Sequence, residues 1–213
     1  TVRRNELFFL LLTVDLPSKA MKMKNIAIFA SGSGTNARNI IEYFENSPEI
    51  IVKRVLSNRE EAPVLQKAEN SGVPATAFSR EQFYGSDAVL NMLLKDRIDL
   101  VVLAGFLWLV PHNILDKFAG RIINIHPALL PRYGGKGMYG ARVHEAVIAS
   151  GDRESGITIH HVNEKYDEGE IIFQAHCPVH PDDTPGSLAQ KIHKLEYRHY
   201  PEVIKKLLQN SKK

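Results

Sequence analysis

Short apolar runs alternate with segments of helical periodicity from residue 25 to residue 149. In the first such segment Ala37, Ile40, Ile41 and Phe44 recur at the spacing of one helix face. The pattern predicts strands at residues 25–30, 50–56, 74–78, 100–104 and 121–125. It predicts helices near residues 37–44, 63–71, 87–95, 111–118 and 142–149. Because strands that alternate with helices are typical of βαβ units, we expect an α/β fold with a doubly wound, mostly parallel sheet.

The last section of this pattern differs, because two β-rich runs follow each other directly. These runs, residues 157–162 and 171–179, are separated by a turn at residues 167–169, which predicts an antiparallel pair. Thr184-Pro185 then predicts the start of a final helix, bent near Pro201. Its apolar face comprises Leu188, Ile192, Leu195, Val203 and Leu207.

The pattern predicts a single domain over residues 24–208, with an N-terminal extension at 1–23 and a tail at 209–213. The extension has a basic start and an apolar run at residues 7–14, which resembles a short secretory signal. We favour an upstream extension that is disordered or not native, because Met21 or Met23 stands directly before the first predicted strand.

Charge and cysteine content exclude several classes of protein. The net charge is +3, and residues 1–24 hold five basic against two acidic residues, so the remaining body is neutral. A neutral body argues against a nucleic-acid partner, whose binding needs a basic surface. The apolar run is too short to cross a bilayer, so we expect no membrane partner. With Cys177 as its one cysteine, the chain has no internal disulfide and no thiol cluster for a metal, so the cytoplasm is the expected location.

A glycine-rich loop follows the first predicted strand. Gly32-Ser33-Gly34-Thr35-Asn36-Ala37 fits the pattern G-x-G-x-x-A between a strand and a helix, which predicts an anion site on backbone N–H groups. A dinucleotide site normally has an acidic residue at the end of the second strand, where this chain has Arg59. The side-chain donors Thr35 and Asn36 favour a phosphate monoester. Binding of NADP and a purely structural turn remain as alternatives.

A second group of polar residues lies at the end of a buried strand. Asn124 and His126 are two apart, so their side chains project to one face, and Pro127 ends the strand. A carboxamide that can donate to a carbonyl oxygen, beside an imidazole that can carry a proton, suits acyl transfer. The alternative is a capped strand end with a hydrogen-bonded histidine. Asp167, in a D-x-G turn, could by itself belong to an ordinary hairpin.

Taken together, three motifs resemble one family. They are Asn124-x-His126-Pro127 with Leu129-Leu130-Pro131, then Asp167-x-Gly169, and the early Ser31-Gly32-x-Gly34-Thr35-Asn36. They resemble the phosphoribosylglycinamide formyltransferases of purine synthesis, from about Lys24 to Leu208. The sequence departs from the family pattern at Ala128, at Glu170, at Trp108 and in a longer loop at residues 134–140. The last two departures concern the folate contacts.

The resemblance implies a Rossmann-like formyltransferase fold and specific roles for residues of this chain. It implies that the catalytic residues are Asn124, His126 and Asp167. It implies that the ribonucleotide is bound by Gly34, Thr35, Asn36, His193 and Glu196. It implies that the folate contacts Arg80, Leu107, Trp108, Leu109, Val110, Asn124, Asn163, Glu164, Lys165, Tyr166 and Asp167.

The implied reaction transfers the formyl group of 10-formyltetrahydrofolate, as cosubstrate, to the amine of glycinamide ribonucleotide, without a metal. The expected partners are therefore small molecules, and the enzyme is expected to be a monomer or homodimer. Sugar-amine formyltransferases, methionyl-tRNA formyltransferase and formyltetrahydrofolate hydrolase share Asn-x-His-Pro. The tRNA enzyme has a further C-terminal domain and a basic surface, and the hydrolase has a regulatory domain. An NADP-binding reductase and an inactive nucleotide-binding module are the alternatives from other classes.

Overall fold

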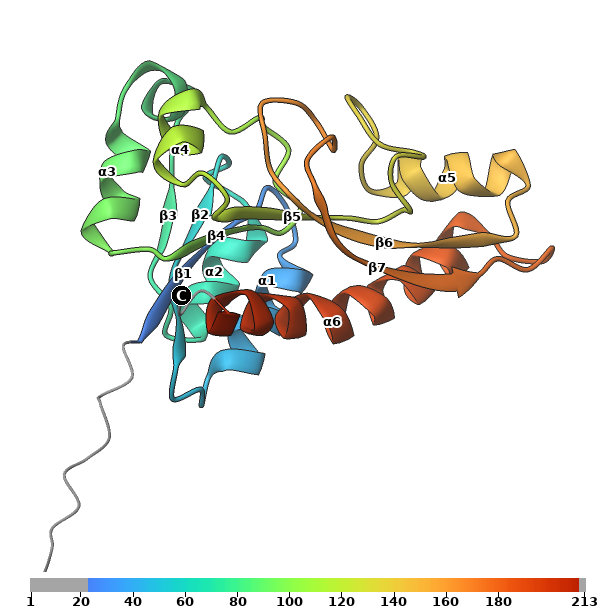
Figure 1. Ribbon diagram of the computed structural model, residues 1–213, viewed down its shortest axis with the longest axis horizontal. Coiled ribbons are helices and arrows are strands. Elements are labelled where there is room, and N and C mark those ends of the chain that lie inside the picture. The colour runs from blue at the N-terminus through green and yellow to red at the C-terminus, as the bar shows by residue number, and fades with distance from the viewer. Residues whose placement is uncertain (1–22, 211–213) are drawn as a thin grey trace, which may run out of the picture.

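The structure is a computed structural model that describes residues 23–210 (Figure 1). Residues 1–22 of the expected extension and residues 211–213 of the expected tail lie outside this range. The strands are β1 (Lys24–Phe29), β2 (Ile50–Ser57), β3 (Ala75–Ala77), β4 (Leu100–Leu103), β5 (Ile122–His126), β6 (Glu154–His161) and β7 (Ile171–Pro178). The helices are α1 (Thr35–Phe44), α2 (Pro63–Asn70), α3 (Ala88–Lys95), α4 (His112–Lys117), α5 (Ala141–Ser150), α6 (Pro185–Asn210) and a short π-helix, η1 (Glu81–Gly85).

All seven strands form one sheet in the order β3-β2-β1-β4-β5-β6-β7. The pairs from β3 to β5 are parallel, and the chain order reverses beside β1, as in a doubly wound sheet. β6 and β7 form the predicted antiparallel pair, and β5 also pairs antiparallel with β6. The mostly parallel α/β fold is thus confirmed, and its antiparallel region includes β5 in addition to the two strands that the sequence pattern indicated.

The alternation of side chains along β1 divides the core into two layers. Ile26 and Ile28 are fully buried on the face covered by α1, α2 and α6. Ala27 and Phe29 are buried on the opposite face, where α3 and α4 pack with a cluster of aromatic rings. Because both faces are covered, β1 and β4 read as unbroken apolar runs in the sequence.

Helix α6 begins where the sequence predicts. The Thr184 hydroxyl accepts a hydrogen bond from Ser187 N–H at 3.1 Å, and the Ser187 hydroxyl accepts one from Thr184 N–H at 2.9 Å, which makes a reciprocal cap. The helix continues through Pro201, and the adjacent Tyr200 is fully buried. The Tyr200 hydroxyl donates to the carbonyl of Leu103 at 2.9 Å, which fastens α6 to the end of β4.

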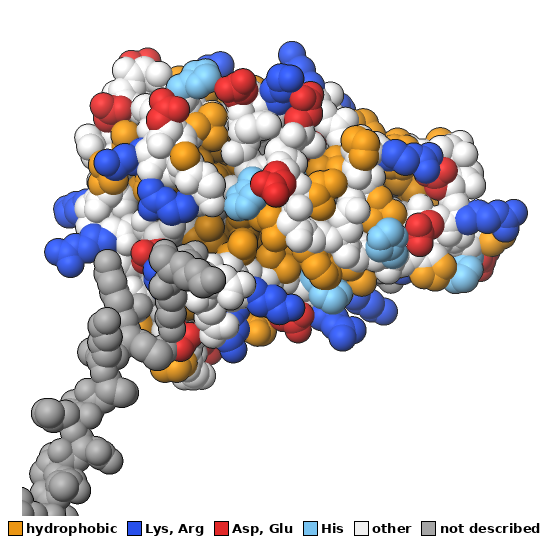
Figure 2. All heavy atoms as spheres, in the orientation of Figure 1, with side chains coloured by type: hydrophobic (Ala, Val, Ile, Leu, Met, Phe, Trp, Pro, Cys, Tyr) orange, Lys and Arg blue, Asp and Glu red, His pale blue; other side chains and the backbone are white. Residues whose placement is uncertain are grey.

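The surface carries charges of both signs. On the face shown in Figure 2, Lys and Arg side chains are interspersed with Asp and Glu. Within residues 23–210, no helix has the length and apolar composition that a bilayer crossing requires.

Candidate functional site

A cavity of about 570 Å³ opens at the carboxyl ends of β1, β4 and β5. This is the edge at which open α/β sheets bind ligands. Its walls come from the glycine-rich loop before α1, the segments after β4 and β5, the loop before α5, the turn between β6 and β7, and α6. The cavity therefore joins the two polar groups that lie far apart in the sequence.

Asn124, His126 and Asp167 meet at one end of this cavity. His126 Nδ1 lies 3.4 Å from Asp167 Oδ2, and Asn124 Nδ2 lies 3.4 Å from Asp167 Oδ1. Asp167 comes from the turn after β6, and its backbone has φ of +57°, in the left-handed region. A non-glycine residue in that region costs on the order of 1–3 kcal/mol, which the surrounding contacts must offset. The geometry thus brings the three expected catalytic residues within reach of one another.

His160 joins this group, although the sequence pattern assigned it no role. It lies opposite Asn124 in the antiparallel register of β5 and β6 and is buried. His160 Nδ1 is 2.8 Å from the carbonyl of His161, so Nδ1 carries the proton and Nε2 is free to accept. Asn124 Nδ2 donates to that Nε2 at 3.1 Å. His160 therefore orients the carboxamide with its NH₂ group toward Asp167.

Burial sets the charge state of His126. The side chain is 4% exposed, and burial lowers the pKa of His126 below its usual value, although the nearby Asp167 carboxylate and the Tyr133 carbonyl raise it. Nε2 donates to the carbonyl of Tyr133 at 2.7 Å, which leaves Nδ1 without a proton in the neutral ring. Because its pKa lies below the usual value, the His126 ring is neutral at neutral pH.

Asp167 remains a carboxylate. Burial by itself raises the pKa of Asp167, but the neighbouring His160 and His126 side chains and the Gly135 N–H together lower it below its usual value. Gly135 N–H donates to Oδ2 at 3.0 Å. A neutral imidazole thus faces an ionised carboxylate, and a proton added to Nδ1 would lie between them.

The glycine-rich loop before α1 lines the same cavity. Gly34 has φ of +70° and precedes α1, so the free N–H groups of the first helical turn face an incoming ligand. A Cβ atom at Gly34 would lie 2.3 Å from Val64 Cγ2 and 2.9 Å from Val64 Cα. The glycine is therefore required both for the turn and for close packing of α2, a second role that the motif did not indicate.

A carboxylate on α6 connects this loop to the rest of the cavity. Glu196 is buried, and its Oε2 lies 3.0 Å from both Asn36 Nδ2 and His193 Nδ1. The hydrogen bond with Glu196 raises the pKa of His193 above its usual value. Asn36 Oδ1 is buried and has no hydrogen-bond partner among the described residues. The expected ribonucleotide residues thus surround one end of the cavity and include an acceptor for a ligand donor.

The expected folate residues divide between the cavity and its surroundings. Those that line it are Leu107, Trp108, Leu109, Val110, Asn124, Lys165, Tyr166 and Asp167. Arg80 lies outside the lining, with its guanidinium 4.9 Å from the Tyr84 ring centroid and 5.6 Å from that of Trp108. Asn163 also lies outside it, where its side chain accepts from Lys165 N–H at 2.9 Å.

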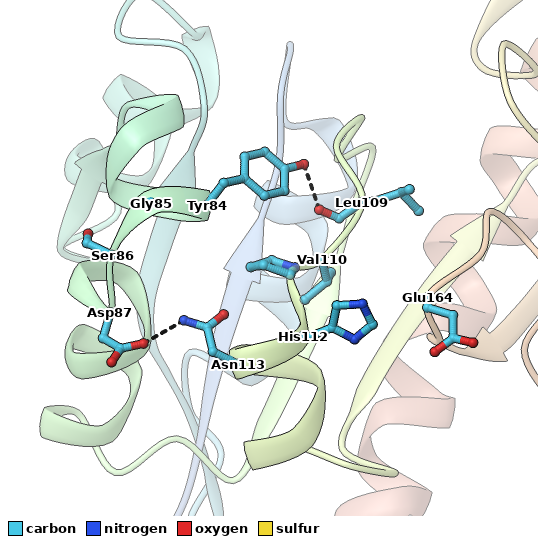
Figure 3. A pocket seen from close by; sticks show the side chains of 10 residues that line it. Tyr84, Gly85, Ser86, Asp87, Leu109, Val110, His112, Asn113 and Glu164 are labelled. Carbon is cyan, nitrogen blue, oxygen red and sulfur yellow. Dashed lines mark hydrogen bonds between the residues drawn. The ribbon is translucent and has the colours of Figure 1, made fainter.

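Glu164 belongs to a neighbouring cavity of about 640 Å³, shown in Figure 3. There the Tyr84 hydroxyl donates to the carbonyl of Leu109 at 2.8 Å, and Asn113 donates to Asp87 at 2.7 Å. Leu109 and Val110 line both cavities. Arg80, Asn163 and Glu164 thus lie outside the lining of the first cavity, and their contacts with a folate stay predictions.

A model of the formyl transferase family matches residues 24–204. The chain belongs to this family. It is 40% identical to a chloroplastic phosphoribosylglycinamide formyltransferase of Arabidopsis thaliana, over 90% of this chain and 68% of that protein. It is 38% identical to a phosphoribosylglycinamide formyltransferase of Haemophilus influenzae, over 86% of each. A crystal structure of phosphoribosylglycinamide formyltransferase from Streptococcus pneumoniae superimposes with a TM-score of 0.77 at 39% identity, over 87% of this chain and 99% of that one.

Family membership makes the chain an enzyme of the formyltransferase class. Within the described residues, no group of three or more His, Cys, Asp or Glu side chains is arranged to hold a metal ion. Two features of the cavity were given no chemical role in the sequence analysis. One is buried His144 on α5, and the other is the pair of basic side chains Lys136, in the loop before that helix, and Arg142, in its first turn. Their helical and glycine-rich contexts carry no chemical motif, so only the fold reveals them.

Proposed function

We propose that the enzyme transfers the formyl group of 10-formyltetrahydrofolate to the amine of glycinamide ribonucleotide. The observation that carries the proposal is one cavity lined both by the glycine-rich loop before α1 and by Asn124, His126 and Asp167. An acceptor with a phosphate at one end and an amine at the other matches this arrangement. The names of the relatives from Arabidopsis and Haemophilus support the same acceptor.

In this proposal the phosphate binds at Gly34, Thr35 and Asn36, where the backbone N–H groups at the start of α1 and the Thr35 hydroxyl can donate to it. Glu196, whose charge also acts on His126, and His193 hold the glycinamide portion of the acceptor. The buried carboxylate of Glu196 accepts hydrogen bonds from Asn36 and His193 and can accept a further one from an N–H group of the acceptor.

The proposed donor lies along the part of the cavity that Leu107, Trp108, Val110 and Tyr166 line. Arg80, stacked beside Trp108 and outside the cavity, is positioned for the acidic tail of a folate rather than for its ring system. A cytoplasmic location and a monomeric or homodimeric state stay predictions.

The chemistry follows from the charge states. The acceptor amine attacks the formyl carbon, a new C–N bond forms, and the formyl oxygen gains negative charge. The Asn124 NH₂ group then donates a hydrogen bond to this oxygen. It gives up its contact with Asp167 to do so, because that contact, at 3.4 Å, is longer than its hydrogen bond to His160 at 3.1 Å. Neutral His126 takes the amine proton at Nδ1, and Asp167 stabilises the imidazolium. The proton then passes to the folate nitrogen as the original C–N bond breaks.

The test is a formyl-transfer assay with glycinamide ribonucleotide, its unphosphorylated riboside, a sugar amine, and no amine. We expect turnover with the ribonucleotide and a KM about 10- to 100-fold higher for the riboside, because charge-assisted hydrogen bonds to phosphate are lost. In Thr35→Ala this difference between the two acceptors should shrink. Faster turnover of the sugar amine, hydrolysis without an amine, or thermal stabilisation by NADPH alone would contradict the proposal.

A further inference from the structure

Both members of the His126–Asp167 pair are held by the same short piece of backbone. The carbonyl of Tyr133 accepts from His126 Nε2 at 2.7 Å, and the N–H of Gly135 donates to Asp167 Oδ2 at 3.0 Å. The intervening Gly134 lies against this pair, because a Cβ there would be 3.2 Å from the Asp167 Cβ. Residues 133–135 therefore fix which imidazole nitrogen carries the proton and where the carboxylate points.

This backbone adopts a conformation that needs support. Tyr133 has φ of +57°, in the left-handed region that non-glycine residues rarely adopt. Its carbonyl contacts His126, whereas its side chain lies outside the cavity lining and packs against the core. We therefore expect contacts of the tyrosine side chain, outside the cavity, to stabilise this backbone conformation.

Such contacts are present at the C-terminal end of α5. The Tyr133 hydroxyl donates to Asp152 Oδ2 at 2.5 Å and lies 2.6 Å from Ser150 Oγ. Arg132 donates to the other Asp152 oxygen at 2.8 Å, and the hydrogen bond from Tyr133 is the largest cause of a lowered pKa of Asp152. The phenol is thus held by an ionised carboxylate, which makes the stronger class of hydrogen bond.

We propose that Tyr133 is a positioning residue, whose phenol, held by Asp152 and Ser150, fixes the backbone that orients His126 and Asp167. The inference rests on the proposed function only for its kinetic consequence. Tyr133 lies outside the lining of the cavity, so its loss should act on the chemical step through His126. It should leave the binding of both ligands nearly unchanged.

The test compares Tyr133→Phe, which keeps the ring and removes the hydroxyl, with Tyr43→Phe, an exposed tyrosine on α1 outside the cavity. We expect kcat of Tyr133→Phe to fall about 10- to 100-fold, the scale of a small misplacement of a catalytic group. Both KM values should change by less than about twofold, because binding contacts remain. Tyr43→Phe should keep the wild-type kcat.

Two substitutions of Asp152 test the same contact from the side of its acceptor. Asp152→Asn keeps a carbonyl oxygen for the phenol and should retain most of the activity, whereas Asp152→Ala should lose as much as Tyr133→Phe. The double variant Tyr133→Phe/Asp152→Ala should lose no more than either single variant, because both remove the same contact. If the kcat of the double variant fell by the product of the two single-variant factors, the proposal would be overturned.

A spectroscopic readout separates this proposal from the proposed function. Nitrogen-15 NMR of labelled histidine should show His126 protonated at Nε2 in the wild type and a mixture of the two tautomers in Tyr133→Phe. If the wild type failed to formylate the ribonucleotide but this tautomer change occurred, the proposed function would fall and the positioning role would stand. An unchanged tautomer in a folded Tyr133→Phe protein refutes the positioning role.

Discussion

Asp167→Asn isolates the charge that the proposed mechanism places beside His126. The substitution keeps the size of the side chain and an oxygen for the Gly135 N–H, and removes the negative charge 3.4 Å from His126 Nδ1. At an effective dielectric constant near 20, two unit charges at this separation attract by about 5 kcal/mol. That energy acts only while His126 is protonated, which in the mechanism is after the amine attacks.

The expected loss of rate follows from this energy. About 5 kcal/mol corresponds to a rate factor of several thousand, and solvent screening and the amide dipole of asparagine reduce it. We therefore expect kcat to fall at least about 100-fold, within the range for one proton-transfer group. The KM values should change far less, because the charge acts on the proton and not on a ligand. The control is Asp116→Asn, an exposed position on α4.

The dependence on pH has a defined sign. Burial lowers the pKa of His126, and Asp167 opposes that effect, so His126 should titrate at lower pH in Asp167→Asn than in the wild type. Because neutral His126 is the base, kcat of the wild type should rise with pH through a pKa below about 6.5, the usual value for histidine. The acid side of the kcat–pH profile should move to lower pH in Asp167→Asn, and the plateau of kcat should lie below that of the wild type.

Steady-state kinetics across pH, with an NMR titration of His126 in both proteins, measures these effects. A plateau rate near that of the wild type would show that the charge is not needed in the chemical step. A histidine that titrates at the same pH in both proteins would show that Asp167 does not act on His126 electrostatically. Either result would leave Asp167 as a turn residue.

Three further predictions concern stability and domain limits. Gly34→Ala should lower the thermal unfolding midpoint, because its Cβ would meet Val64 and its φ is +70°; an unchanged midpoint would contradict the close packing. When the pH is lowered from about 7.5 to about 5.5, the free energy of unfolding measured in urea should fall less for His144→Gln than for the wild type. Burial lowers the pKa of His144, so as the pH falls the unfolded chain binds a proton at this histidine before the folded protein does, which favours unfolding. Equal losses in the two proteins would show that His144 titrates at its usual pKa. We propose that residues 24–208 form the complete domain, so a chain that begins at Met23 should fold with wild-type turnover, and insoluble or inactive protein would refute this limit.

Much of the fold could be predicted because local pattern and tertiary structure agree. The apolar residues expected on one face of the first helix, Ala37, Ile40, Ile41 and Phe44, are all buried against the sheet. The π-helix at Glu81–Gly85 was not predicted, because it is a single short turn around one buried residue, Phe83. The antiparallel pairing of β5 with β6 was also missed, since it joins segments separated by a loop and a helix.

The candidate site was predictable only where its residues are local in sequence. Asn124 and His126 share a face of one strand, so their proximity follows from the period of a strand. Their contact with Asp167, more than 40 residues further on, depended on the family resemblance. The role of His160 required the register between β5 and β6, and no periodicity supplies a register. The support from Tyr133 depends on a backbone conformation that the residue type itself disfavours.

His126–Asp167 and His193–Glu196 are both histidine–carboxylate pairs of the cavity, and their surroundings give them opposite behaviour. His126 is 4% exposed and lies 3.4 Å from its carboxylate, so burial outweighs the attraction and lowers its pKa. His193 is 47% exposed and lies 3.0 Å from Glu196, so the hydrogen bond outweighs burial and raises its pKa. In the proposed function, the neutral His126 ring serves as a base for the amine, and the more readily protonated His193 ring lies with Glu196 at the glycinamide portion of the acceptor. Exposure and the distance to the carboxylate thus shift the two pKa values in opposite directions.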